Sequence, residues 1–314
     1  MTAPRTRREP RTGTDAQADA SSSESRLAWA LAMPALSIIA LVALFPILWT
    51  FWESLHLHDL RMPWLGRPFV GAANYIEVLG TPRVWSALGH TGFFVAATLA
   101  LELSAGLLLA MALDRVTRGR GLVRTAVLLP WAIPTVVAAL VWRFIFESPA
   151  GLATTLLAGL GVGAPTWFAD AVAAWVPLLL ADAWKTTPFV AILLLAGLQN
   201  IDRSLYEAAE VDGAGAWRQF VEITLPLLRP ALLVAALFRS LDAFRVFDLV
   251  YVMTGGGPGT ATEPIALYTF TTLLQNLQFG LGSALSIIVF AVAFLFALGV
   301  IHLFGSGAFL ERAA

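Results

Sequence analysis

The sequence predicts an all-α protein with six helices that cross a membrane. Hydrophobic residues make up 58% of the 314-residue chain and charged residues only 13%, whereas a soluble domain carries about 25% charged residues. Helical stretches of about 20 apolar residues are long enough to cross a bilayer. Several such stretches recur along the chain, and one compact polar segment interrupts them.

Six segments are long and apolar enough to be spans. They are 27–52, 86–113, 125–146, 172–198, 229–253 and 283–305. The first is too long for a secretory signal and has no small-residue cleavage site after a short apolar run. Residues 1–25 are rich in Arg, Pro, Thr and Ser and have little to bury, so they are expected to form a disordered cytoplasmic tail ahead of a six-span domain at 26–314.

The distribution of arginine predicts the orientation of the chain. The first 26 residues carry five arginines, and the loops at 114–124 and 199–229 carry seven more. The loops at 147–171 and 254–282 have none. Because basic residues concentrate on the cytoplasmic side of spans, both termini are expected in the cytoplasm, with the chain as a multi-pass protein of a bacterial plasma membrane.

The composition excludes several kinds of bound group. The chain has no cysteine, so disulfides and thiolate-bound metals are excluded. Its only lysine, Lys185, follows Trp184, so the Gly-Lys-Ser/Thr pattern that holds ATP in a P-loop is missing. The glycines at 254–260 therefore predict a turn. His56 and His58 have no third ligand nearby in sequence, so no metal site is expected. A nucleic-acid partner is not expected either.

The polar segment YEAAEVDGAGAWRQFVEITLPLLRP lies between the fourth and fifth apolar segments. Ser204 and Glu207 have the spacing of a capping box, which predicts a helix start. Asp212 and Gly213 predict a sharp turn. The stretch AWRQFVEI predicts a second short helix, which Pro226 is expected to stop. The segment therefore has the pattern of a folded helix-turn-helix element.

Two uses of this element are open. A helix lying on lipid headgroups is one, but anionic lipids favour Lys and Arg, and this segment is acidic. Its small alanines favour the other use, close docking by a cytoplasmic protein.

The same segment resembles the EAA loop of binding-protein-dependent ABC importer permeases. The resemblance, at about 199–228, is carried by Glu207-Ala208-Ala209, Asp212-Gly213-Ala214, Phe220 and Ile223-Thr224-Leu225-Pro226. Four other stretches resemble sugar permeases of the maltose-transporter type. They are FVGAANY at 69–75, RTAVLLPWAIPTVVAALVW at 124–142, WKTTPF at 184–189 and FDLVYVMTGGGP at 247–258. The last is commoner in the first permease of a heterodimeric pair.

The resemblance implies that the chain is half of a transmembrane pathway and pairs with a second permease subunit. Two cytoplasmic ATPase subunits would hold the ATP and Mg, and an extracytoplasmic binding protein would deliver the solute. The implied solute is a carbohydrate such as trehalose or maltose, with glycerol phosphate or another small polyol as the alternative. Glu207 would form a salt bridge with the ATPase, and Ala208, Ala209, Asp212 and Gly213 would complete the docking surface.

Charged residues inside the predicted spans are candidates for the solute path, because such residues usually face protein or water. Arg239, Asp242, Arg245 and Asp248 alternate in sign at steps of three, so on one helix they would form a ladder. The path candidates are Asp242, Arg245, Asp248, Tyr251, Trp184 and Glu102. Two structural alternatives stay open: an intrahelical Asp182–Lys185 pair, and Glu102 as a packing anchor between helices.

Two rival functions are also considered. An ion-coupled secondary transporter could use Glu102 or the charged ladder as a relay, but such carriers often show internal repeats, and none is visible in this sequence. A membrane-embedded enzyme would need a nucleophile and a base inside the bilayer. The serines of the spans lack the surroundings of a nucleophile elbow, so the chain is not expected to be an enzyme.

Overall fold

The computed structural model describes residues 13–310 except residue 164. The described chain is helical, and its only β pairings are two isolated bridges. Its elements are α1 (Gly13–Ser54), η1 (Pro63–Leu65), α2 (Ala73–Gly80), α3 (Pro82–Arg115), α4 (Arg120–Ala132), α5 (Thr135–Phe146), α6 (Leu152–Gly159), α7 (Trp175–Leu198), α8 (Arg203–Val211), α9 (Ala216–Gln219), η2 (Phe220–Thr224), α10 (Leu225–Phe244), α11 (Asp248–Met253), α12 (Ile265–Phe270), η3 (Thr271–Gln275) and α13 (Phe279–Leu310).

The chain divides into two units, residues 1–53 and residues 54–314. The described part of the first unit is α1, whose apolar stretch Leu27–Ser54 is long enough to cross a bilayer. Residues 13–25 belong to this helix, so the expectation of a disordered tail is wrong for them. Between Pro10 and Pro34 there is no proline, and the alanines there favour helix. Residues 1–12 lie outside the described part of the chain.

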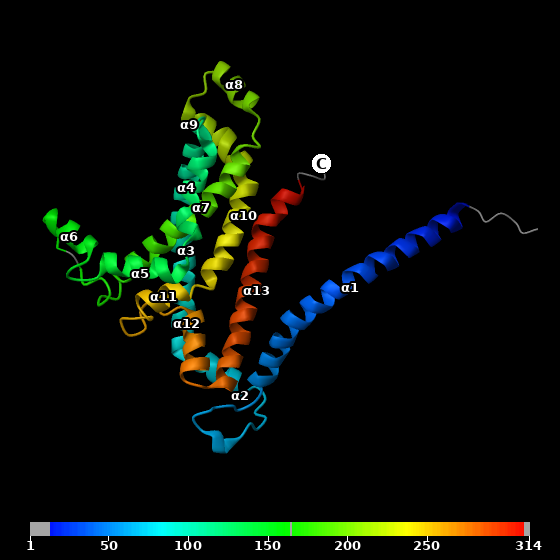
Figure 1. Cartoon of the computed structure of the whole chain (residues 1–314), viewed down its shortest axis with the longest axis vertical. Helices are drawn as coiled ribbons and strands as arrows, with labels where there is room; N and C mark the ends of the chain where they lie inside the picture. The colour runs from blue at the N-terminus through cyan, green and yellow to red at the C-terminus, as the bar shows by residue number, and fades with distance from the viewer. Residues whose placement is uncertain (1–12, 164, 311–314) are drawn as a thin grey trace, which may run out of the picture. The chain divides into compact units, whose positions relative to one another are not determined.

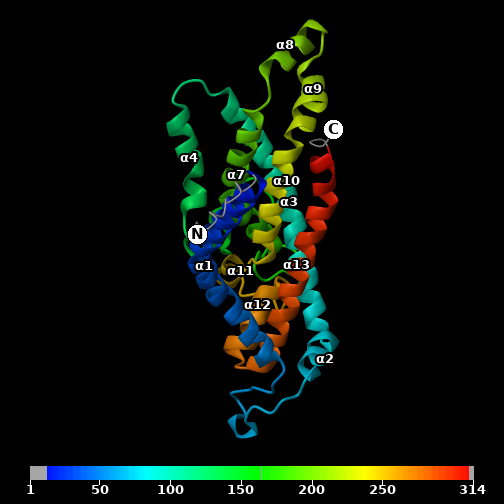
Figure 2. The same cartoon turned by 90° about the vertical axis from the view of Figure 1, so that its right-hand side faces the viewer.

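The expectation of six membrane spans agrees with the helices of the described residues. Five helices are long and apolar enough to cross a membrane, and the pair α4 and α5 makes a sixth span if it is counted as one. In the second unit α3, α7, α10 and α13 run side by side (Figures 1 and 2). At one end of this bundle, α8 and α9 project beyond α7 and α10 (Figure 1).

The third predicted span, 125–146, is broken instead of straight. α4 and α5 meet at an angle of 84°, and Ile133 between them is extended, with φ −70° and ψ 132°. The residue before a proline is pushed out of the helical region by the proline ring, and Pro134 follows Ile133. The break directs α5 away from the bundle, where it packs against α7 and α11 (Figure 1).

The fifth predicted span, 229–253, is wrong at both ends. Its helix ends at Phe244, and a new helix, α11, begins at Asp248 after a short non-helical link. Asp248 therefore does not continue the helical face of Arg239 and Asp242. The predicted ladder is present in part: Asp242 lies 2.5 Å from Arg239 Nη1 and 3.9 Å from Arg245 Nη2, each three residues away. The step from Arg245 to Asp248 is lost, because steps of three bring side chains together only within an unbroken helix.

Pro226 does not stop the short helix before it. α9, the π-helical turn η2 and α10 form one continuous helix from Ala216 to Phe244. In the π turn the N–H of Leu225 donates to the carbonyl of Phe220, five residues back. Pro226 lies in the first turn of α10, directly after this wider turn, where its missing N–H is accommodated without breaking the helix.

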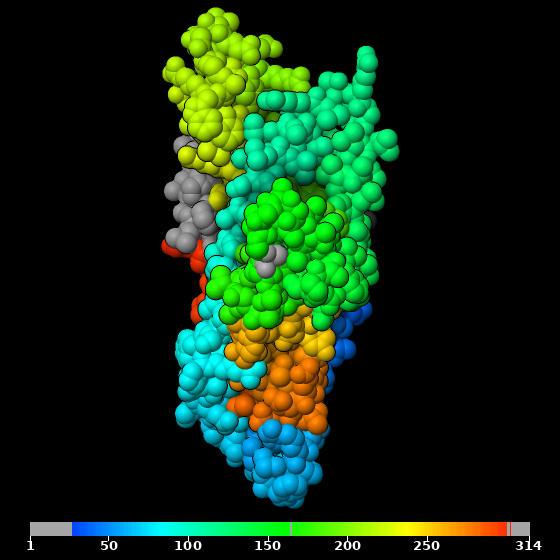
Figure 3. All heavy atoms as spheres, turned by 90° about the vertical axis from the view of Figure 1, so that its left-hand side faces the viewer, coloured from blue at the N-terminus to red at the C-terminus, as the bar shows by residue number. Residues whose placement is uncertain are grey.

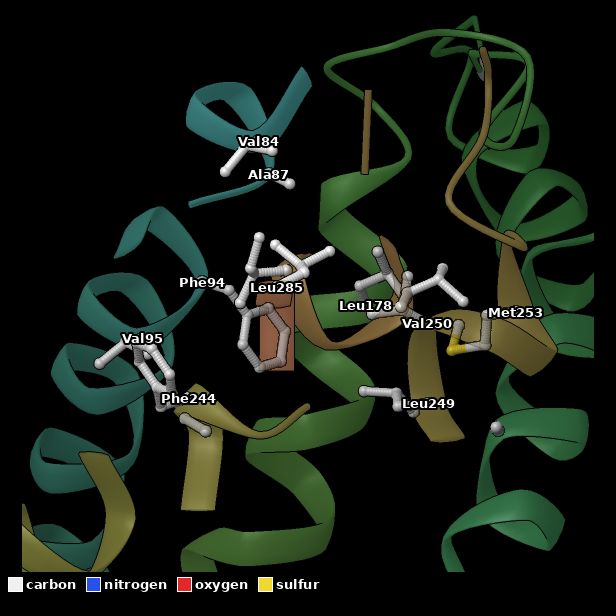
Figure 4. Close-up of a cluster of buried hydrophobic side chains, with 14 of the residues drawn as sticks. Val84, Ala87, Phe94, Val95, Leu178, Phe244, Leu249, Val250, Met253 and Leu285 are labelled. Atoms are coloured by element: carbon white, nitrogen blue, oxygen red, sulfur yellow. The ribbon is translucent and has the colours of Figure 1, made fainter. Parts of the chain in front are cut away.

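The core of the second unit consists of two apolar clusters. The larger cluster joins the first half of α3, the start of α7, the end of α10, α11, α12 and the start of α13. Figure 4 shows Phe94, Leu178, Phe244, Leu249 and Leu285 within it. The smaller cluster joins the second halves of α3 and α7 to α10, near the end that carries α8. Since α3, α7 and α10 contribute to both clusters, the residues between the clusters lie on these same three helices.

Small residues allow the three central helices to approach closely. A Cβ added to Gly106 of α3 would lie 2.6 Å from Val190 Cγ1 of α7, and one added to Gly197 of α7 would lie 2.6 Å from the Cβ of Ala231 in α10. Small residues at helix crossings are a main source of packing between membrane helices. Any larger side chain at Gly106 must therefore separate α3 from α7.

We expect Gly106→Leu to destabilise the purified chain strongly. Overpacking a tight contact costs about 1–3 kcal/mol, and the nearest atoms here include the α7 backbone at Ala191 N, 3.4 Å away. Thermal unfolding in detergent measures the effect. Gly92→Leu, on the same helix, is the matched control because a Cβ there meets nothing within 4 Å. Equal unfolding temperatures for the two variants would contradict this packing.

Candidate solute cavity and coupling element

A buried layer of charged residues separates the two apolar clusters. Its centre is Arg239 of α10, whose side chain is 3% exposed. The guanidinium donates from Nε and Nη2 to Glu102 of α3, from Nη2 to Asp182 of α7 at 2.9 Å, and from Nη1 to Asp242 at 2.5 Å. The planar guanidinium has five donors and suits such multiple carboxylate contacts. One arginine thus ties together the three central helices.

Glu102 is part of this layer and lines neither of the two cavities beside it. Its side chain is fully buried, and its Oε1 lies 2.5 Å from the Thr186 hydroxyl, which donates to it. The structural alternative for Glu102, a packing anchor hydrogen-bonded to a neighbouring helix, matches this geometry. Asp182 likewise pairs with Arg239, whereas Lys185 Nζ donates to the carbonyl of Trp131 at 3.3 Å. No Asp182–Lys185 ion pair exists among the described residues.

A cavity of about 360 Å³ opens beside the buried layer, between α7, the end of α10 and the start of α11. Three of the predicted path residues, Asp242, Arg245 and Asp248, line it together. The break after Phe244 brings them there, because it turns the chain across the cavity instead of along it. Arg245 Nη2 lies 3.9 Å from Asp242 Oδ1. The cavity is also lined by Asp182 and Lys185, for which an intrahelical pair was the structural alternative, and by Thr186 and Thr135, which the sequence did not single out.

A second cavity of about 540 Å³ shares Thr186, Arg239, Asp242 and Arg245 with the first. Its other walls are apolar and aromatic. Trp131 of α4 and Phe189 of α7 stack there with ring centroids 5.7 Å apart. The sequence does contain a signal that could have identified Trp131: it lies between Pro130 and Pro134, where the third span breaks. The shared residues therefore have polar groups on one side and aromatic rings on the other.

The aromatic path candidates lie elsewhere. Trp184 packs on Trp142 of α5, with ring centroids 6.0 Å apart. Tyr251 stacks on Phe247 at 5.4 Å. Neither residue lines either of the two cavities. Trp184 is next to Lys185 in sequence, but successive residues on a helix point in directions about 100° apart, so it faces α5 and not the cavity.

The helix-turn-helix pattern of the polar segment is present, but its cap is one that the sequence interpretation missed. α8 is capped by Asp202, whose carboxylate accepts the backbone N–H of Ser204 at 2.9 Å. This hydrogen bond lowers the pKa of Asp202 below its ordinary value. The predicted capping box, with Ser204 as cap, starts the helix too late. Gly213 has φ +78°, so the turn uses the left-handed conformation that glycine favours.

One side-chain contact ties α8 to the helix that follows it: the hydroxyls of Tyr206 in α8 and Thr224 in η2 are 2.9 Å apart. Within the element, the N–H of Ala214 donates to the carbonyl of Ala209 at 2.8 Å and closes the turn after α8. Of the residues that the resemblance placed on a docking surface, Glu207, Ala208, Asp212 and Gly213 are exposed and Ala209 is half-buried. These five residues are called the coupling surface below.

Residues 102–314 match the protein family described as binding-protein-dependent transport system inner membrane component. The match covers more than half of the chain. The chain belongs to this family. It is therefore a transport permease and a multi-pass membrane protein, not an enzyme, as the EAA-loop resemblance predicted.

Curated relatives match nearly the whole permease. The trehalose/maltose transport system permease protein MalF of Thermococcus litoralis is 42% identical over 87% of this chain and 92% of its own length. The trehalose transport system permease protein SugA of Mycobacterium tuberculosis is 38% identical, with 91% of each chain covered. The sulfoquinovosyl glycerol transport system permease protein SmoG of Agrobacterium fabrum is 38% identical over 85% of this chain and 86% of its own length.

The fold of the permease is also that of a solved structure. A bacterial ABC transporter involved in the import of the acidic polysaccharide alginate superposes with a TM-score of 0.77, covering 91% of this chain and 98% of that chain at 21% identity. The permease therefore has the fold of an ABC importer transmembrane subunit, which confirms the predicted all-α fold with six membrane-spanning helices.

Proposed function

We propose that this permease forms half of the pathway of an ATP-driven importer for an uncharged di- or oligosaccharide such as trehalose or maltose. The observation that carries the proposal is the pair of adjoining cavities. A sugar needs donors and acceptors for its hydroxyls and an aromatic face for its C–H surface. The first cavity supplies charged hydrogen-bonding groups, and the second supplies the Trp131–Phe189 stack. The trehalose and maltose transport named for two relatives supports the same solute class.

The charges of the first cavity favour a neutral solute. Three carboxylates, Asp182, Asp242 and Asp248, face three cations, Lys185, Arg239 and Arg245. An anion such as glycerol phosphate would need an excess of cations, because an uncompensated charge inside a membrane protein costs several kcal/mol. We therefore place glycerol phosphate, the alternative substrate from the sequence, behind neutral sugars.

We expect Asp248→Ala to lower solute uptake about tenfold, since a hydrogen bond to a charged group contributes about 1.5–3 kcal/mol. Asp248 is exposed to the cavity and has no ion-pair partner among the described residues. Arg245→Ala is expected to act in the same direction. Uptake of radiolabelled sugar into cells gives the rates, and co-purification of the subunits checks assembly. Glu147→Gln, an exposed acid outside both cavities, is the control. Normal uptake in both cavity variants would remove these residues from the solute path.

We further infer that the coupling surface docks onto a cytoplasmic ATPase subunit. The Asp202 cap and the Gly213 turn define the element, and the Tyr206–Thr224 contact ties α8 to η2, which continues into α10. A rigid element that continues directly into a membrane helix can transmit a rigid-body movement to the spans. In this proposal two ATPase subunits bind the ATP and Mg²⁺, a second permease completes the pathway, and an extracytoplasmic protein delivers the solute. If the coupling surface docks onto the ATPase, the end of the bundle that carries α8 faces the cytoplasm. Both chain termini are proposed to lie on that side of the membrane as well.

Reconstitution tests the whole proposal. The permease and its co-purifying subunits are placed in liposomes, with the binding protein and labelled trehalose or maltose on the outer side. Uptake that requires hydrolysable ATP inside and persists with an ionophore is expected. Uptake that collapses with the ionophore at constant ATP would instead favour the ion-coupled carrier, and uptake of glycerol phosphate in preference to both sugars would reject the neutral-solute assignment.

A further inference from the structure

A larger cavity, of about 610 Å³, lies at the end of the bundle that carries α8. Its walls come from the end of α3, the start of α4, the end of α7, and α8 itself. Figure 3 shows the α3–α4 region and the α8–α9 region as two neighbouring prominences at this end. The charged residues that line it are Asp114, Arg115, Arg120, Arg124, Arg203, Glu207 and Glu210. This cavity is separate from the two at the buried charged layer and shares no residue with them.

These charged side chains have no oppositely charged partner within the described part of the chain. None of the seven takes part in an ion pair there. Arg120 donates from Nε to the carbonyl of Val116 at 2.6 Å. The Nε atom of Arg124 is buried and has no hydrogen-bond partner among the described residues. A buried donor left unsatisfied is destabilising, so an acceptor in the cavity would stabilise the protein.

The arrangement of the arginines fits a phosphate group. Arg120 and Arg124 are four residues apart on α4, so they lie on one face of that helix. Arg115 ends α3, and Arg203 faces them from α8. The planar guanidinium matches the oxygens of a phosphate in a bidentate geometry that an ammonium group cannot offer. The four arginines exceed the three carboxylates by one charge, which is the charge of a phosphodiester.

The position of the cavity selects among phosphate compounds. Its arginines lie at the end of the candidate span α3, at the start of α4 and on α8. Basic pockets between the cytoplasmic ends of membrane helices bind anionic lipid headgroups. Met111, Leu198 and Ile201 add an apolar part to the lining, suited to the glycerol and upper acyl region of a lipid. We propose that this cavity binds a singly charged phosphate group, as the headgroup of an anionic phospholipid or as a soluble phosphate compound.

Such a ligand would contact the coupling element directly, because Arg203, Tyr206 and Glu207 of α8 line the cavity. A phosphate held between α4 and α8 braces α8 against the bundle. The proposal does not depend on the identity of the transported solute or on ATP coupling, so its test uses unfolding and binding, not transport.

The test compares thermal unfolding of the purified full-length chain in detergent with no addition, with phosphatidylglycerol, with phosphatidylcholine and with inorganic phosphate. At 100 times the dissociation constant, phosphatidylglycerol is expected to raise the unfolding temperature by about 5 °C, and phosphatidylcholine is expected to leave it unchanged. A shift with inorganic phosphate alone would assign the site to soluble phosphates. An equal shift with both lipids, or no shift with any addition, would overturn the proposal.

Matched variants locate the effect. Arg124→Gln is expected to abolish the shift, and Arg118→Gln, which removes an exposed arginine of the same loop that does not line the cavity, is expected to keep it. If Arg124→Gln fails to fold, Arg124→Lys retains the charge without Nε and is expected to reduce the shift. Native mass spectrometry should then find one phosphatidylglycerol retained per wild-type chain and none per Arg124 variant. Retention by both would place the lipid elsewhere and reject this cavity.

Discussion

Replacing Arg239 with alanine is expected to prevent the chain from folding stably in the membrane. The substitution leaves Glu102 and Asp182 facing each other inside the bundle without their cation. Breaking a buried ion pair by removing one partner costs about 3–5 kcal/mol, and here one arginine serves several carboxylates. Thermal unfolding in detergent, together with the yield of monodisperse protein, measures the loss.

A compensated variant separates charge from packing at this position. Arg239→Met combined with Glu102→Gln and Asp182→Asn removes the three most buried charges together and leaves Asp242, which is 62% exposed. It is expected to recover much of the lost stability, because neutral groups cost less to bury than unpaired charges. Arg245→Ala is the control, since that arginine is 76% exposed and its loss should change the unfolding temperature little. An Arg239→Ala protein that unfolds like the wild type would contradict the central role of the charged layer.

Replacing Gly213 with tryptophan is expected to abolish transport while leaving the chain folded. A Cβ at Gly213 meets nothing within 4 Å, so the chain itself accommodates the ring, but a docked ATPase would not. Uptake should fall at least about 30-fold, since a lost interface hot spot costs about 2 kcal/mol or more. ATP-dependent uptake in liposomes and co-purification of the ATPase are the two measurements.

The positive φ of Gly213 requires a control for backbone strain. Any L residue at φ +78° is strained, by about 1–2 kcal/mol, so Gly213→Ala shares this cost without the bulk. Gly213→Ala is expected to retain most of its uptake. If alanine and tryptophan block uptake equally, the defect comes from the turn and not from docking. Wild-type uptake in Gly213→Trp would contradict docking at the coupling surface.

Much of the architecture could be predicted because it depends on local patterns. The apolar segments identified the membrane helices, and the polar segment after the fourth of them identified α8, its turn and the following short helix. The prolines were harder to interpret. Pro134 breaks a span that hydropathy treats as continuous, whereas Pro226 breaks nothing because a π turn precedes it. Hydropathy is an average over side-chain polarity. It does not show where a proline interrupts the backbone hydrogen bonds of a helix and where the helix accommodates it.

The candidate site was predicted in part. Asp242, Arg245 and Asp248 do line one cavity, although the helical ladder that suggested them stops at Arg245. Trp184 and Tyr251 were chosen for their chemistry, but their rings pack against other aromatic side chains. Trp131 and Phe189 form the aromatic wall instead, because they come from two different helices and nothing in either helix alone indicates the other.

The sequence by itself determined the membrane-spanning class of the protein, its number of apolar segments and the position of the polar helix-turn-helix element, because each follows from residues close together in the chain. Only the tertiary structure decided which charges meet. Glu102 and Arg239 are 137 residues apart, and Asp182 and Arg239 are 57 apart. Whether an intramembrane charge binds solute or holds helices together depends on the partner it meets across a helix interface, and that partner is set by the packing of α3, α7 and α10 around their small residues.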